Sequence, residues 1–499
     1  MADEQNQTPE EQEPLVRFAG TSNMLGRRRA YFDAETIDAG NVVQAIRDTI
    51  STHQANCIQM KYLWRYYRGD QPILRREKQV RPEICNKVVE NHAQEVVSFK
   101  VGYQLSEPIQ YICRNSEDED SKTKEIAALN TLMFAEDKDA SDRDLFEWMC
   151  IEGWGYRFIE SDGTDAESHL DDSINTPGAA PFNLHVPEPW CAYIIYSNRY
   201  HKRPLAGVWV GEAGNESKVY TVYTPSQVFT IREDKLVNVE INGIGRIPII
   251  EYDLNNARMG VFEAALPILD AINNVVSNRL DGIEQVVQAL YLFKNCQVDQ
   301  ETFLAMLDLG AVNVKSVDGG QGDVELITND LDQTQTQVAK DDLYNALINI
   351  CGMPNRNTGG ANDTGSAVLL RDGWTLAESH AKSYELQFKK AEREMLRVVL
   401  DICAASDEPV NLTLRDIDLA FNRRNYDNIL TKAQTFTTLV QTGKVALQDC
   451  YSVSGLFTDP SAAAIRGMAY AEEQQQKAQE LVAQQPSQQY ENGGGAEAE

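Results

Sequence analysis

The sequence predicts a mainly helical α+β fold built from more than one structural unit. Residues 264–290 and 366–403 carry apolar side chains at steps of three or four, which is the spacing of an amphipathic helix. Residues 145–252 form short runs separated by Gly, Asn, Asp and Pro, which indicates an antiparallel β-rich unit. Because 499 residues exceed the usual size of one core, we expect two to four units.

The remaining segments add further helices and short strands to this pattern. Helices are expected over 41–68, where Gly69 is a natural stop, and over about 83–101. The later expected elements, in chain order, are short strands around a small helix at 291–332, a helix at 333–352, a strand at 411–421, a helix at 427–442 and two short helices within 444–471. Both ends of the chain are polar and poor in apolar residues, so we expect them to be disordered.

The stretch NRNTGGANDTGSAVLLRDGW, residues 355–374, resembles a phosphate-binding loop that leads into a helix. No lysine follows its glycines, so it lacks the G-x-x-x-x-G-K-[ST] order of nucleotide-binding loops. A mobile loop, with Thr364 or Ser366 as N-cap of the next helix, is the simpler interpretation. Gly373, near the start of that helix, is a candidate position for a kink.

No constellation of catalytic or metal-binding residues is recognisable. The nine cysteines form no C-x-x-C pair, and the six histidines are dispersed, so we expect reduced thiols, no metal, no cofactor and no enzymatic activity. No apolar run approaches the roughly 18 residues that a membrane span needs, and the polar, acidic N-terminus is no signal peptide. The net charge of −29 repels nucleic acid phosphates at long range.

Residues 61–81 are basic, although the chain as a whole is acidic. The basic residues are Lys61, Arg65, Arg68, Arg75, Arg76, Lys78 and Arg81. This segment is either a contact for an acidic partner or a neighbouring subunit, or a solvated helix end, and the sequence leaves both open. The aromatic residues Tyr62, Trp64, Tyr66 and Tyr67 are expected to pack in a core or interface rather than stack on bases.

Three features together resemble the portal proteins of tailed double-stranded DNA bacteriophages. The first is the order helix, small insertion, helix, glycine-rich loop, long helix, strand and helix over residues 264–442. The second is YYRGDQPILRR followed by NKVVENHAQEVVSFKVGY, and the third is IDLAFNRRNYDN. The resemblance covers roughly residues 40–470.

The resemblance implies a portal fold with wing, stem, clip and crown. Its expected parts are a disordered arm (1–30), the wing (31–263), stem helices (264–290 and 333–353), the clip (291–332), a tunnel loop (354–366), a long helix, strand and helix (367–443), the crown (444–475) and a disordered tail (476–499). The implied DNA-channel residues are Asn355, Arg356, Asn357, Thr358, Gly359, Gly360, Ala361, Asn362 and Asp363. The clip residues expected to contact terminase and connector proteins are Asn295, Gln297, Asp299, Lys315, Asp318, Gln321 and Asp323.

Such a protein is expected to form a ring, typically of twelve subunits, at one capsid vertex of the virion, after assembly in the host bacterial cytoplasm. The ring would pass double-stranded DNA without sequence specificity and would bind the terminase large subunit, head-tail connector proteins, and major capsid and scaffold proteins. Arg356 and Asp363 are the only charges in the loop, so it could touch phosphates without holding them tightly. The alternative is a capsid or tail structural protein without a DNA channel, and an enzyme is a distant third.

Overall fold

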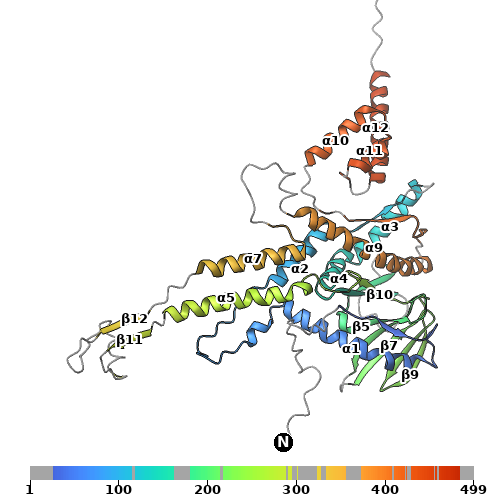
Figure 1. Cartoon of the computed structure of the whole chain (residues 1–499). Helices are drawn as coiled ribbons and strands as arrows, with labels where there is room; N and C mark the ends of the chain where they lie inside the picture. Colours follow the sequence, from blue (N-terminus) through green and yellow to red (C-terminus); the bar gives the residue numbers. More distant parts are fainter. Residues whose placement is uncertain are drawn as a thin grey trace, which may run out of the picture. The chain divides into compact units, whose positions relative to one another are not determined.

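The structure is a computed structural model (Figure 1). It describes residues 26–114, 119–161, 180–213, 217–287, 290–294, 301, 323–327, 333–355, 373–406, 410–421, 423, 429–454, 456–457 and 460–483. The chain divides into two compact units. The first contains Met1–Gly102, Ser141–Glu160 and Leu184–Met395, and the second contains Tyr103–Ala140, Ser161–Asn183 and Leu396–Glu499. Helices predominate and are combined with sheets, so the predicted mainly helical α+β class is confirmed.

A six-stranded sheet in the order β1-β5-β6-β7-β8-β9 dominates the first unit. Its strands are β1 (Ala30–Phe32), β5 (Ala192–Ser197), β6 (Pro204–Ala213), β7 (Ser217–Tyr223), β8 (Gln227–Arg232) and β9 (Lys235–Ile241). From β5 to β9 each strand pairs antiparallel with the next, whereas β1 pairs parallel to β5. The predicted antiparallel unit is therefore present, with one parallel strand added from the N-terminal segment.

The two faces of this sheet are covered differently. Helix α1 (Val42–Tyr67) packs Val42, Ala45 and Ile46 against buried residues of the sheet on one face. A second cluster joins Met60 of α1 to Ile194 of β5 and to a three-stranded sheet, ordered β10-β3-β4. Those strands are β3 (Trp154–Ser161), β4 (Phe182–His185) and β10 (Ile249–Asp253).

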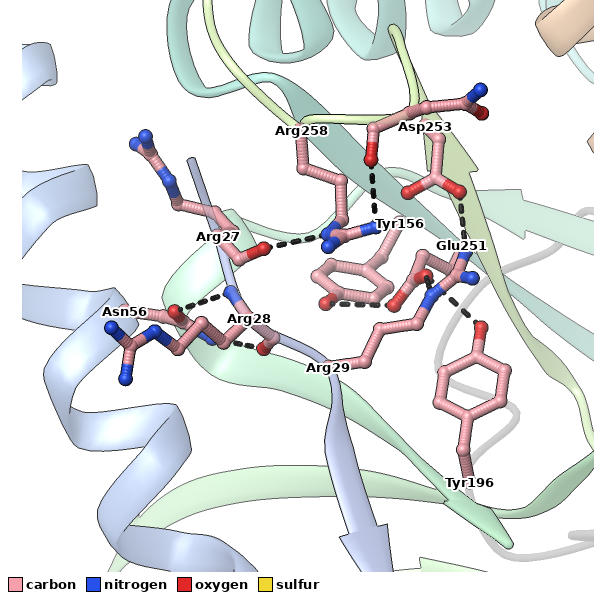
Figure 2. Close-up of polar contacts among 10 residues, drawn as sticks. Arg27, Arg28, Arg29, Asn56, Tyr156, Tyr196, Glu251, Asp253 and Arg258 are labelled. Carbon is pink, nitrogen blue, oxygen red and sulfur yellow. Dashed lines mark hydrogen bonds and ion pairs between the residues drawn. The ribbon is translucent and has the colours of Figure 1, made fainter. Parts of the chain in front are cut away.

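Charged groups fasten the segment before β1 to this core (Figure 2). The fully buried guanidinium of Arg27 pairs with Glu263, and Arg29 pairs with Glu251 and Asp253. The backbone of Arg28 exchanges two hydrogen bonds with the Asn56 side chain, at 3.0 and 2.8 Å. Residues 26–30 are thus held in the fold although they were predicted to belong to a disordered arm, and residues 1–25 lie outside the described residues.

Besides α4 (Lys138–Glu152), most of which lies in the first unit, four further helices belong wholly or partly to it. They are α2 (His92–Gln104), α5 (Leu266–Val287), α7 (Gln333–Cys351) and α9 (Trp374–Ala405), and α5 and α7 lie side by side (Figure 1). The predicted helices at 264–290 and 333–352 agree closely with α5 and α7. Helix α2 begins at His92 rather than near residue 83, because residues 86–90 are bound along α5 instead.

The second unit contains a small sheet and a helical end. Strands β2 (Gln110–Cys113) and β13 (Ile417–Ala420) pair antiparallel, and helix α3 (Glu119–Ala135) packs beside β2. Helices α10 (Ile429–Thr442), α11 (Leu447–Ser454) and α12 (Pro460–Ala483) follow. Ring contacts join Phe436 of α10, Tyr451 of α11 and Phe457 of the segment before α12, so an aromatic cluster packs α10 against α11. Helix α12 continues past the predicted tail boundary at residue 475.

Helices α3 and α4 (Lys138–Glu152) were not predicted. The region assigned to strands from residue 145 onward begins with the second half of α4, and the first strand there is β3. Buried apolar residues at helical spacing, Ile126, Leu129 and Met133 in α3, and Leu145 and Met149 in α4, are the signal that identifies them. Within the ranges that the structure describes, no helix is both long and apolar enough to cross a membrane.

Candidate functional site: the root of the 356–372 loop

Helix α7 ends in a well-formed cap immediately before the predicted loop. The Met353 N–H donates to the Ile348 carbonyl at 2.9 Å, and the Gly352 N–H donates to the Asn349 carbonyl at 3.3 Å, which is the Schellman arrangement. Gly352 has φ +59°, the left-handed conformation that this cap requires. The sequence Cys351-Gly352-Met353-Pro354 therefore stops the helix at a defined residue.

The chain returns to the same place at the start of α9. Gly373 has φ +80°, and a Cβ built on it would lie 3.5 Å from the Met353 carbonyl oxygen and 3.7 Å from Pro354 Cα. The described chain before residue 356 and after residue 372 is thus close together, since one methyl group on Gly373 would reach Met353. Gly373 precedes α9 rather than bending it, so the kink considered at this position is wrong.

Of the nine residues expected to face DNA, only Asn355 lies among the described residues. Its side-chain amide contacts the Asn345 side chain of α7 at 3.3 Å, so it belongs to the root of the loop. Arg356, Asn357, Thr358, Gly359, Gly360, Ala361, Asn362 and Asp363 lie outside the described residues, as do the expected caps Thr364 and Ser366. Their role in a channel stays a prediction.

Helix α2 supplies the side chains that hold both ends of the root. Lys100 is buried, and its Nζ donates to the Gly352 carbonyl oxygen at 2.8 Å. The neighbouring Phe99 ring lies 6.1 Å from the Trp374 ring at the start of α9. One turn of α2 therefore contacts the end of α7 and the beginning of α9.

Lys100 is a cation held at a helix C-terminus, where the backbone carbonyls favour positive charge. Burial lowers its pKa from 10.5 to about 8, so it still carries its proton at neutral pH. His380 of α9 borders Gly352, and burial and then the Lys100 charge lower the pKa of its imidazole. We did not single out Lys100 from the sequence, although one lysine within the apolar run VVSFKVG is a signal of a buried cation.

A second set of contacts fixes α5 beside this root. The strap, residues 86–90, donates its backbone N–H groups from Asn86, Val88 and Glu90. The acceptors are the buried side chains of Asp281, Ser277 and Asn273, at 2.7, 3.0 and 2.8 Å respectively. Successive donors of the strap are two residues apart, which spans about 6.6 Å in an extended chain. Successive acceptors on α5 are four residues apart, which spans about 6.0 Å in a helix, so donors and acceptors stay opposite each other.

The strap also reaches α7 and draws on the basic segment 61–81. Lys340 of α7 pairs with Glu90 of the strap at 2.6 Å, and Arg76 and Lys78 pair with Asp281 of α5 at 3.2 and 2.6 Å. Burial would raise the pKa of Asp281, but hydrogen bonds from Lys78 and Asn86 hold it below its ordinary value.

At least four of the seven basic side chains in this segment make ion pairs with described residues: Arg76 and Lys78 with Asp281, and Arg65 and Arg75 with Asp70. This favours an intramolecular role for them over contact with an acidic partner. The packing expected for the aromatic residues is confirmed: Tyr66 is fully buried, and the Trp64 and Trp148 rings lie 4.6 Å apart.

The range expected for the clip, residues 291–332, contains one described pair of strands, and its assignment as a clip stays a prediction. Strands β11 (Leu290–Lys294) and β12 (Asp323–Ile327) pair antiparallel, with Lys294 opposite Asp323. Asn295, Gln297, Asp299, Lys315, Asp318 and Gln321 lie outside the described residues, so their contact with terminase or connector proteins stays a prediction. Over the described ranges we find no group of three or more His, Cys, Asp or Glu side chains placed to hold a metal ion.

Comparison with known families decides how this arrangement is interpreted. The family described as "Phage portal protein, SPP1 Gp6-like" matches residues 47–485. The chain belongs to this phage portal protein family. The resemblance seen in the sequence and the portal fold are thereby confirmed, and the family is a structural rather than an enzymatic one.

Two solved particles contain chains similar to this portal protein. One is titled "Neck of empty GTA particle computed with C6 symmetry" (TM-score 0.44, 12% identity), and the other "Virion of native gene transfer agent (GTA) particle" (TM-score 0.41, 11% identity). Each match covers 80% of this chain and 94% of the other. A search of curated proteins gives no match.

Proposed function

We propose that this portal protein forms a ring, typically of twelve subunits, at one capsid vertex, and that the ring is the channel for DNA packaging and ejection. The predicted tunnel loops of the subunits, residues 354–366, would encircle the DNA, with α5 and α7 as stem helices behind them. The β11–β12 hairpin and the segment that it brackets would bind terminase and head-tail connector proteins. Nucleotide hydrolysis would belong to the terminase, and the ring itself would carry no catalytic activity.

The observation that carries this proposal is the closed root of the loop. The described chain stops at Asn355 and resumes at Gly373, and a Cβ added to Gly373 would lie within 4 Å of Met353 and Pro354, so the two described ends are close together. Lys100 and Phe99 hold that point from α2, so the root stays fixed whatever the loop does. A loop that contains glycines and is anchored at a fixed root could change conformation and stay in contact with a DNA duplex as the duplex moves through the ring.

Low charge in the loop would keep this contact weak. Each phosphate neutralised by a bound protein makes release more salt dependent, and a ring repeats every contact many times. Arg356 and Asp363 are the only charged residues between 355 and 363, so the loops would guide DNA rather than retain it electrostatically.

Packaging and retention of DNA in particles assembled with variant subunits test the proposal. Arg356→Ala and deletion of residues 357–362 should each change the amount of DNA retained, while Arg393→Ala, on the exposed side of α9, should behave as wild type. Wild-type packaging and retention in both loop variants would remove the loop from the mechanism. Images of rings with a central hole would exclude the alternative of a structural protein without a channel.

A further inference from the structure

Two buried carboxylates of β10 share one guanidinium (Figure 2). Arg29 Nε donates to the Glu251 carboxylate at 2.9 Å, and the same guanidinium pairs with Asp253. Glu251 and Asp253 lie two residues apart on the strand, so their side chains leave the same face of the sheet. These side chains are 4% and 13% exposed, so both carboxylates are largely shielded from water. One guanidinium cannot neutralise two carboxylates.

The neighbouring strands present hydroxyl groups to this pair. Tyr156 of β3 and Tyr196 of β5 donate hydrogen bonds to Glu251, at 3.5 and 3.0 Å. Burial raises the pKa of each of these tyrosines well above its ordinary value, so both hydroxyls stay protonated. Because a hydroxyl carries no charge, these hydrogen bonds do not replace a second cation.

The other charged and titratable groups on this side lie on α1, on α9 and in the loop after β10. Burial lowers the pKa of His53 on α1 to about 4 and raises that of Cys57 to about 12, so both are neutral near pH 7. Arg258 of the loop and Lys390 of α9 are cations that favour the ionised form of Asp253. The two carboxylates therefore remain in competition for the cation that both contact.

This competition favours the binding of one proton by the pair. Burial, and then the charge of Asp253, raise the pKa of Glu251 from 4.5 to about 7, and burial also raises the pKa of Asp253. Two carboxylates that share one site titrate together, so the proton belongs to the pair rather than to one residue. The folded chain thus holds a proton at pH values where an exposed carboxylate has lost it.

The segment that supplies Arg29 also covers the two carboxylates, and we call residues 26–30 the latch segment. It lines a small cavity together with Glu251. It also reaches the start of α5, because Arg27 pairs with Glu263 in the short helix just before α5. Lifting the latch segment would expose the carboxylates to water and loosen the junction between β10 and α5.

We propose that Glu251, Asp253 and Arg29 form a pH-sensitive latch, in which one proton bound by the two carboxylates keeps the latch segment closed and its loss favours opening. The closed state has the raised pKa, so closure is favoured at low pH and weakens as the pH rises from 4.5 to about 7. This device acts within one chain and does not depend on the ring proposed above.

Amide hydrogen exchange in the full-length protein tests the latch. In the closed segment the Arg27 N–H donates to the Arg258 carbonyl at 3.1 Å and the Arg28 N–H donates to the Asn56 side chain at 3.0 Å. Both amides are therefore protected until the segment opens, and exchange rates corrected for the intrinsic effect of pH give the opening constant. Linkage to one proton changes this constant by up to about tenfold per pH unit. We expect a rise of at least about fivefold from pH 5 to pH 7.

Three variants make this measurement specific. Glu251→Gln removes the shared proton and keeps the shape of the side chain, so its opening constant should change less than about twofold from pH 5 to pH 7. Asp253→Asn removes the competing charge, so the rise should move to lower pH. Glu240→Gln, at an exposed position of β9, is the matched control and should follow wild type. A smaller rise in wild type, or wild-type behaviour of both Glu251→Gln and Asp253→Asn, would overturn the latch.

Infrared difference spectra between pH 5 and pH 7 detect the shared proton without relying on opening. A protonated carboxyl absorbs separately from an ionised one, and Asp270, whose pKa burial raises to about 6, contributes a signal common to wild type and variant. We expect wild type to lose a further protonated-carboxyl signal that Glu251→Gln lacks at both pH values. Identical difference spectra for the two proteins would show that Glu251 and Asp253 hold no proton and would overturn the proposal.

Discussion

The segment before β1 and the root of the predicted tunnel loop are both anchored to the fold by basic side chains, but these side chains bind different partners. At the first, Arg27 is paired with the carboxylate of Glu263. Arg29 is paired with Glu251 and Asp253, as Figure 2 shows. At the second, the single cation Lys100 is bound to a backbone carbonyl. A guanidinium keeps its charge at any pH that a protein survives, whereas a buried lysine does not. The charge of both arginines at the first anchor is therefore permanent, whereas Lys100 loses its charge as the pH rises above about 8.

The largest effect is expected from Arg27→Met. It would leave Glu263 buried without its cation, beside Glu152, whose pKa burial already raises well above its ordinary value. Removing one partner of a buried pair costs about 3–5 kcal/mol, which chemical denaturation would measure. Arg28→Met is the matched control, because the exposed Arg28 contacts Asn56 only through its backbone. Equal stability of the two variants would contradict the role given to the buried pair.

The second prediction concerns the pH dependence of Lys100. Its pKa is about 8 in the folded chain against 10.5 as the ordinary value, so between these limits the unfolded chain binds the proton more tightly. Stability then rises with pH across this window, by up to roughly 1.4 kcal/mol per pH unit. The wild type should gain stability over Lys100→Met from pH 8 to 10.5, and should show no such gain between pH 6 and 7.

Two controls make the Lys100 measurement specific. Burial raises the pKa of the surrounding groups Cys150, Cys351 and Tyr384, so they remain neutral across most of this window, and His380 is already neutral. Lys382→Met, at an exposed position of α9, should follow the wild-type curve. Parallel curves for wild type and Lys100→Met would show that this lysine is not a titrating anchor.

The smallest effect is expected from Gly352→Ala. A Cβ at this position would lie 2.8 Å from the His380 ring, in addition to the cost of φ +59° for a residue with a side chain. We expect a loss of about 1–3 kcal/mol and faster amide hydrogen exchange at Met353. Gly245→Ala is the control, because Gly245 also has a positive φ, +74°, but an added Cβ there would meet no atom within 4 Å. It should lower the free energy of unfolding by only about 1–2 kcal/mol. A cost for Gly352→Ala no larger than that of Gly245→Ala would show that the contact with His380 contributes nothing.

The sequence predicted the long helices well because their apolar spacing is a local property. Helices α5 and α7 follow directly from residues such as Leu269 and Leu347, both buried as expected. The strap was missed, because its hydrogen bonds depend on Asp281 and Asn273, nearly 200 residues away in sequence. Helix α3 was missed although its spacing was visible, since its exposed face is mixed and polar.

At the candidate site, too, the local sequence features were predictable and the contacts between distant segments were not. The absence of a lysine after the loop glycines was enough to exclude a nucleotide-binding loop of the usual order. The closure of the root could not be predicted, since it needs Gly373 to meet Met353 across the loop and Lys100 to approach from a separate helix. Pairing of the basic segment with Asp281 likewise depends on tertiary structure, whereas Asp70 is only five residues from its partners Arg65 and Arg75.

Photo-crosslinking from position 357 to DNA tests the central claim most directly. A photoreactive residue replaces Asn357 in full-length protein assembled into DNA-filled particles, and position 200 on the β5–β6 turn serves as the comparison. The proposed channel predicts strong crosslinking of DNA from position 357 and none from position 200. DNA-filled particles in which position 357 gives no more crosslinking than position 200 would contradict the placement of this loop around the duplex.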